Sequence, residues 1–142
     1  FRFPTDNKGN AHYGKDFIKR AIALPGDTVE IRDKKVFVNG QLQTEPFAQF
    51  EDDYLIPPAD LLAEKERFQE LWETRRLDRA PGGEIVRDNF GPVVVPAHTY
   101  FVMGDNRDRS FDGRFWGPMP DTHLKGKAWV LYWPFSRWKI IR

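Results

Sequence analysis

Alternating apolar and polar positions, the pattern typical of half-buried strands, recur through most of the chain. They predict a first strand over residues 16–24, which ends in the turn-forming run Leu-Pro-Gly-Asp, and a hairpin made of 28–32 and 35–40. The segment 93–105 is predicted to form two paired strands joined by a tight turn, and 125–142 supplies the last strands. The pattern therefore predicts a mainly β domain with antiparallel sheets.

A helical periodicity occupies the middle of the chain. Residues 58–77 hold strong helix formers behind two prolines, with apolar side chains at helical spacing and charges on the opposite face. The apolar positions are Leu61, Phe68, Leu71 and Trp72. We therefore expect one amphipathic helix at about 58–77. The 142 residues are predicted to form a single truncated domain, 1–142, with a variable helical insertion at about 45–90.

Composition excludes several classes of protein and site. The net charge of +1 argues against a nucleic-acid binder, since such domains are usually more basic. The absence of cysteine excludes disulfides, thiolate metal sites and a cysteine nucleophile. His12, His98 and His123 are isolated, lie in predicted turns or loops and lack metal-ligand spacing, so we interpret them as surface residues. We expect no metal and no cofactor.

The longest apolar stretch, 128–135, is far shorter than the ~20 residues that cross a bilayer. No signal peptide is visible and the first residue is Phe1, so we expect the sequence to be a piece of a longer chain. Aromatic residues crowd the last third of the sequence. Most are expected in the core, and the alternative is an exposed patch at a membrane interface. They are Phe115, Trp116, Trp129, Trp133, Phe135 and Trp138.

Lys19 is the first candidate for chemistry. On the predicted strand it shares a face with Phe17, Ala21 and Ala23, so its ammonium group would lie against apolar neighbours. Loss of hydration lowers the pKa of a lysine and allows the neutral amine to accept a proton near neutral pH. The alternative is an edge-strand lysine whose stem packs while its charged end reaches water.

The segment 104–114, GDNRDRSFDGR, is the second candidate and is too polar and too rich in turn formers for a core. Asp108, Ser110, Asp112 and Gly113 match positions 1, 3, 5 and 6 of a calcium-binding EF-hand loop. The twelfth position, however, is Met119, and the three arginines of the segment would repel a cation. The segment is therefore either a loop fixed by its own charge-assisted hydrogen bonds or a catalytic loop that orients a hydroxyl, such as that of Ser110. A Ser–His–Asp triad is disfavoured, since Ser110 and Ser136 are the only serines.

In combination, these motifs resemble the type I signal peptidases, which use a serine–lysine dyad. The resemblance covers both ends of the chain, and the variable insertions of the family fall at about 45–90. The resemblance is highly specific because the segment around Lys19 and the 104–114 segment both match, in this order. The matching runs are FIKR at 17–20, LPGD at 24–27, VNG at 38–40, YFVMGDNRDRSFDGRFWG at 100–117 and the closing GKAWVLYWPF.

The resemblance implies a membrane-associated serine endopeptidase of the signal-peptidase fold. Such enzymes remove signal peptides from exported preproteins at the outer face of the bacterial cytoplasmic membrane. Its partners would be those signal peptides and the membrane lipid surface, with no nucleic acid and no metal. Segments absent from this sequence would anchor it.

Residue roles follow from the same motif match. Lys19 corresponds to the general base of the family, and Ser110 to the serine whose hydroxyl orients that lysine. Asp112 and Arg114 correspond to a supporting ion pair. Asp16, Phe17 and Ile18 correspond to a strand that flanks the substrate groove.

The sequence also departs from the family. The nucleophilic serine of the family lies upstream of the segment that matches 1–4, and neither it nor the oxyanion-hole residues beside it are in the sequence, so we expect these 142 residues alone to be inactive. Gly113 stands where the family usually has serine. A non-catalytic peptide-binding module with the same fold remains an alternative. A relative of the self-cleaving repressors is disfavoured by the 104–114 segment and by the lack of a DNA-binding segment.

Overall fold

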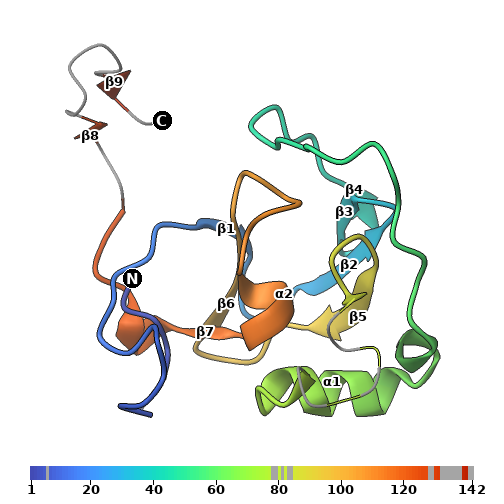
Figure 1. The fold of residues 1–142 in the computed structure, drawn as a ribbon, viewed down its shortest axis with the longest axis horizontal. Coiled ribbons are helices and arrows are strands. Elements are labelled where there is room, and N and C mark those ends of the chain that lie inside the picture. Colours follow the sequence, from blue (N-terminus) through green and yellow to red (C-terminus); the bar gives the residue numbers. More distant parts are fainter. Residues whose placement is uncertain are drawn as a thin grey trace. The chain divides into compact units, whose positions relative to one another are not determined.

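The computed structural model describes residues 1–5, 7–77, 80, 82, 85–127, 130–131 and 139–140. Two compact units are distinguished, one made of 1–18 with 122–142 and the other of 19–121. The larger unit, 19–121, contains two of the three sheets that the described residues form (Figure 1). The prediction of a mainly β, antiparallel architecture is confirmed.

The first sheet of the larger unit has four antiparallel strands, and its tight turns are local features of the sequence. Asp33 and Lys34 have φ of 48° and 67°, and Asn39 and Gly40 have φ of 52° and 76°. Two successive positive φ values give the turn that matches the twist of a two-residue hairpin, so the predicted hairpin is confirmed. The strand order is β4 (Gln41–Leu42), β3 (Lys35–Val38), β2 (Thr28–Arg32) and β5 (Phe90–Val94).

The second sheet has the order β1 (Arg20–Ala23), β6 (Thr99–Met103) and β7 (Met119–Pro120). The strand predicted over 16–24 is therefore shorter, and Lys19 immediately precedes it. A bulge follows Ala21, which pairs with Val102 whereas Ala23 pairs with the adjacent Phe101. Because the bulge breaks the alternation, Ala21 is exposed and Ala23 is buried, and the predicted shared face is wrong.

The prediction of a strand pair within 93–105 is also wrong. β5 pairs with β2 and β6 pairs with β1, so consecutive strands enter different sheets. The residues between β5 and β6 lead the chain from the first sheet to the second and include His98, with φ of 60°. Alternation identifies a strand and its buried face, but the partner is chosen by packing between distant segments.

The predicted helix at 58–77 divides into a 3₁₀ helix η1 (Asp60–Ala63) and an α-helix α1 (Lys65–Glu73). Glu64, with φ of −95° and ψ of 70°, interrupts them. α1 lies along β5 in Figure 1 and buries Phe68 and Trp72. The Trp72 ring lies 5.9 Å from those of both Phe90 and Phe101, so the inserted helix forms part of the core.

The smaller unit holds a pair of antiparallel strands, β8 (Val130–Leu131) and β9 (Lys139–Ile140). In the N-terminal part of this unit, His12 is half-buried, and the centre of its ring lies 5.1 and 5.3 Å from the ring centres of Phe3 and Phe17. Its interpretation as a surface residue is therefore only partly correct, whereas the side chain of His98 is 88% exposed. The short helix η4 (Asp121–His123) joins the two units in sequence, and His123 is half-buried.

Among the predicted core aromatics, Trp116 is buried and Phe115 packs on the core. Predictions for four others, Trp129, Trp133, Phe135 and Trp138, fall outside the described residues. In the part of the chain that is described, no helix combines the length and the apolar character needed to cross a bilayer.

Candidate active site

The candidate site contains a direct contact between Lys19 and Ser110, which are 91 residues apart. Nζ of Lys19 donates a hydrogen bond to Oγ of Ser110 at 2.8 Å. Arg20, at the start of β1, pairs with Met103, at the end of β6. This pairing brings Lys19 next to the loop that follows β6 and carries Ser110, so sheet register creates the contact.

The surroundings of Lys19 make its charged form less stable than that of a lysine in water. The side chain is half-buried, and burial lowers the pKa of Lys19 below its ordinary value. The carboxylate of Asp112 acts in the opposite direction, Arg114 adds to the lowering, and Asp105 opposes it. The sequence-based expectation of a lysine with a lowered pKa agrees with this balance, although the expected apolar face shared with Ala21 and Ala23 does not form.

Asp112 and Arg114 form a buried ion pair at the end of the loop that carries Ser110. Nε and Nη2 of Arg114 donate to the two carboxylate oxygens of Asp112, both at 2.9 Å. The backbone N–H of Gly104 donates to the same carboxylate at 3.0 Å. Asp112 also caps the short helix α2 (Gly113–Trp116) by accepting from the N–H of Arg114. The pair therefore connects the two ends of the loop.

The expectation that 104–114 is too polar for a core is only partly correct, because part of this segment is buried. Arg107, Asp112 and Arg114 are 2%, 0% and 1% exposed. Each of these charges has several charge-assisted partners, which offsets the cost of burying it. Besides Asp112, Arg114 donates to the carbonyl oxygens of Arg107 and Arg87, at 2.8 and 2.7 Å.

Two further ion pairs lie beside the site, and sequence reasoning predicted neither of them. Arg20 makes a two-pronged pair with Asp105 at 2.9 and 2.8 Å, and this pair lowers the pKa of Asp105. Arg107 makes a similar pair with Glu45. The adjacency of Arg20 to Lys19 was a usable signal, but no local pattern marks Glu45.

Asp16, Phe17 and Ile18 belong to the smaller unit, 1–18 with 122–142, and have different surroundings there. Asp16 accepts a hydrogen bond from Lys125 at 2.6 Å, and this bond lowers the pKa of its carboxyl. Phe17 packs among aromatic rings, and Ile18 is 84% exposed. No group of three or more metal-ligating side chains occurs among the residues that the structure describes.

Comparison with known proteins decides the family. Residues 1–133 match the family model described as signal peptidase, peptidase S26. The chain belongs to this family. It is 32% identical over 136 residues to the signal peptidase I of Leptolyngbya laminosa, covering 94% of this chain and 50% of that protein. It is 35% identical over 128 residues to that of Bacillus licheniformis, covering 89% and 54%.

The chain thus spans about half the length of the curated signal peptidases it matches. The crystal structure of a signal peptidase I from Enterococcus faecalis V583 is similar, with a TM-score of 0.50 and 29% identity over 80% of this chain and 83% of that one. The sequence resemblance and the mainly β fold of the signal peptidase family are therefore confirmed.

Proposed function

We propose that this chain is the core of a membrane-associated serine endopeptidase that removes signal peptides from exported preproteins with a Ser–Lys dyad. Family membership supports the reaction class, since the chain matches the signal peptidase model over 1–133. The observation that carries the proposed mechanism is the 2.8 Å hydrogen bond from Lys19 to Ser110 together with the burial that lowers the pKa of Lys19.

Lys19 is the general base in this proposal. When neutral, its amine donates one N–H to Ser110 Oγ and keeps its lone pair for a proton from the nucleophile. The nucleophile is a second serine, supplied by a segment that precedes Phe1 in the complete protein, as the family motif implies. Its hydroxyl is a weak nucleophile until a base takes the proton.

The proton taken from the serine is then transferred through Lys19 to the leaving group. The serine oxygen attacks the scissile carbonyl, and the protonated Lys19 gives the proton to the leaving amine as the peptide bond breaks. A water molecule, deprotonated by the same amine, hydrolyses the acyl-enzyme. Ser110 orients Lys19 throughout, and the ion pair of Asp112 and Arg114 holds the loop that carries Ser110.

Backbone groups of β1 are suited to bind the substrate. Among the strands that the structure describes, β1 lies at one edge of its sheet, so an extended signal peptide can add to it through main-chain hydrogen bonds. The exposed Ala21 leaves room on that strand. Asp16, Phe17 and Ile18 directly precede Lys19 in the sequence, and by the family resemblance we propose them as further substrate-binding residues. The site would work at the outer face of the bacterial cytoplasmic membrane, against the lipid surface, anchored by segments outside these 142 residues.

Substitution of Lys19 in the complete protein tests the function. Lys19→Ala should lower cleavage of a preprotein roughly 100- to 10,000-fold, the usual contribution of a general base, with the melting temperature retained. Ser110→Ala should cost less, about 2–3 kcal/mol in activation free energy. Lys35→Ala, at an exposed lysine on β3, is the control. Normal processing by folded Lys19→Ala protein would rule out the dyad.

Trapping the acyl-enzyme identifies the nucleophile. A peptide ester that acylates the active serine, followed by acid quenching and peptide mapping, should label a serine that precedes Phe1. The same probe should leave the isolated 142-residue chain unlabelled. Label on Ser110 would make Ser110 itself the nucleophile, and a complete protein that binds signal peptides but is never acylated would support the peptide-binding module.

A further inference from the structure

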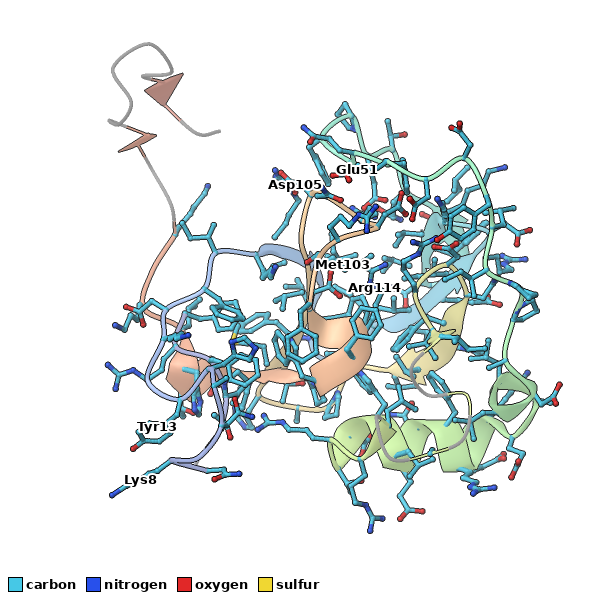
Figure 2. The ribbon with its side chains drawn as sticks, in the orientation of Figure 1. Lys8, Tyr13, Glu51, Met103, Asp105 and Arg114 are labelled. Atoms are coloured by element: carbon cyan, nitrogen blue, oxygen red, sulfur yellow. The ribbon has the colours of Figure 1, made fainter. Side chains whose placement is uncertain are left out.

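Segment 45–52, which lies in the expected variable insertion, runs along the loop that carries Ser110. The N–H of Gln49 donates to the carbonyl of Asp105 at 2.8 Å, and the N–H of Arg107 donates to the carbonyl of Gln49, also at 2.8 Å. Figure 2 shows Glu51, on this segment, and Asp105, on the loop, at the same end of the unit. The two segments therefore pair through their backbones.

Glu45 holds the loop through an arginine. Its carboxylate accepts from Nη1 and Nη2 of Arg107 at 2.8 and 2.7 Å, and the two side chains are only 10% and 3% exposed. Nε of the same guanidinium donates to the carbonyl of Gly104 at 3.1 Å. Gly104 is in turn linked to Asp112 by its N–H. A continuous set of charge-assisted bonds thus runs from Glu45 to the first residue of the loop.

Phe47 contacts both arginines that fix this loop. The guanidinium of Arg20 lies 3.7 Å from the centre of the Phe47 ring, and that of Arg107 lies 5.9 Å from it. Arg20 follows Lys19 directly and pairs with Asp105. The ring therefore lies next to the first residue of β1 and within reach of the loop.

The loop also holds the segment in return. The carboxylate of Asp108, whose side chain is fully buried, accepts from the N–H groups of Glu51 and Asp52 at 2.7 and 2.8 Å. Lys34 lies 3.1 Å from the same carboxylate. Both ends of segment 45–52 are thus fixed to the loop, at Glu45 and at Asp52.

We propose that segment 45–52 is a clamp, in which Glu45 and Phe47 are positioning residues that hold the loop 104–110 so that Ser110 meets Lys19. A buried ion pair often stabilises a fold no better than apolar residues of the same volume, whereas its two-pronged hydrogen bonds fix the orientation of the two side chains. The expected effect of the clamp on the rate of proteolysis rests on the proposed role of Lys19 as general base. Its expected effect on the pKa of the Lys19 amine does not depend on that role.

The first experiment measures the amine in the 142-residue chain without any proteolysis. Reductive methylation of Lys19 is followed by mass spectrometry as a function of pH in Glu45→Gln, in Phe47→Leu and in the control Glu70→Gln. The control removes an exposed ion pair between Glu70 on α1 and Arg76. The charged groups that act on Lys19, namely Asp105, Asp112 and Arg114, are unchanged in all three. We expect the labelling midpoint to rise towards that of an ordinary exposed lysine in the first two variants, because the loosened site admits water and the lowering of the Lys19 pKa by burial is lost. The control should keep the wild-type midpoint.

The second experiment measures turnover in the complete protein. A misplacement of about 1 Å costs up to about 100-fold in rate, so kcat should fall by that order in Glu45→Gln while KM changes little. Glu45→Asp keeps the charge and should recover part of the loss. A general loss of stability would lower the amount of active enzyme but would leave the pH profile of the remainder unchanged.

The outcomes separate the two proposals. A folded Glu45→Gln chain with the wild-type labelling midpoint and wild-type kcat would overturn the clamp. If Glu45→Gln does not fold, Phe47→Leu takes its place, since this variant keeps an apolar side chain. Wild-type labelling and kcat in Phe47→Leu would then overturn the clamp. Altered labelling in the clamp variants, together with normal processing by Lys19→Ala, would support the clamp and reject the dyad.

Discussion

Gly104 and Ser110 share one small space, which has no room for a second side chain. A Cβ atom built on Gly104 would lie 2.2 Å from Ser110 Oγ, 2.7 Å from Ser110 Cβ and 3.2 Å from Lys19 Nζ. The absence of a side chain at this position is therefore a condition for the contact between Lys19 and Ser110.

Gly104→Ala should disrupt the site more than the fold. The added methyl group displaces the serine side chain, so Lys19 loses the hydrogen bond that orients it. We expect processing by the complete protein to fall up to about 100-fold. The overpacking should cost about 1–3 kcal/mol of stability, measured by urea denaturation.

Gly40→Ala is the matched control for this prediction. Gly40 has a positive φ in a turn and nothing within 4 Å of a built Cβ, so alanine there strains the backbone without touching the site. It should lower stability and leave the rate per folded molecule unchanged. Equal activity of the two alanine variants would show that position 104 does not control Ser110.

Gly113→Ser introduces the residue that is usual in the family, and this chain should tolerate it poorly. A Cβ at this position would lie 2.8 Å from the carbonyl oxygen of Val102 and 3.3 Å from its nitrogen, both in the backbone of β6. Because backbone atoms cannot rotate away, we expect a loss of about 1–3 kcal/mol. Urea denaturation of the 142-residue chain checks this, and an unchanged midpoint would contradict it.

Local signals explain what could be predicted from the sequence. The hairpin of β2 and β3 follows from turn residues that adopt positive φ, Asp33 with Lys34, which lie between the paired strands. The partners of β5 and β6 are not local: Phe90 pairs with Ile31, and Met103 with Arg20. Alternation along one segment contains no information about partners that lie so far away in sequence.

The candidate site shows the same division. Polarity alone placed the 104–114 segment outside the core, because the burial of Arg107 depends on Glu45, which no local motif marks. The contact between Lys19 and Ser110 was expected through family resemblance, since residue spacing could not choose between a catalytic loop and a self-paired one. Sequence patterns find the charged groups, and tertiary pairing decides which of them are buried.

Trp72→Phe should show that α1 stabilises the backbone at Gly113, next to the ion pair of Asp112 and Arg114. Nε1 of Trp72 donates to the carbonyl of Gly113 at 2.7 Å, and the ring is fully buried. Phenylalanine keeps most of the apolar contact but leaves a buried carbonyl without this donor, at a cost of about 1–3 kcal/mol.

The control is Gln69→Ala on the same helix. Gln69 bonds both backbone groups of Val94, but at the solvent-exposed edge of β5, where water can replace it. We expect a loss below about 1 kcal/mol there, since water compensates exposed hydrogen bonds. Thermal or urea denaturation compares the two, and a larger loss for Gln69→Ala would contradict the assignment of the supporting contact to Trp72.

Acid should destabilise the larger unit through Asp108. Burial raises the pKa of Asp108, but the N–H groups of Asp52 and Glu51 and the ammonium of Lys34 outweigh it and hold the pKa below the ordinary value of 3.8. The folded state therefore binds fewer protons than the unfolded state in this range. The stability that the carboxylate contributes is complete well above pH 3.8 and is lost as the pH falls through the lowered value.

Asp108→Asn tests this dependence, because the amide does not titrate. The variant should be less stable at neutral pH by about 3 kcal/mol, since Lys34 loses a buried partner. Its free energy of unfolding should also fall less steeply than the wild-type value as the pH drops from 5 to 2, a range of about three units around the ordinary carboxyl pKa. Asp53→Asn, at an exposed neighbour of the clamp, should keep the wild-type slope. Parallel curves for Asp108→Asn and the wild type would show that the acid sensitivity arises elsewhere.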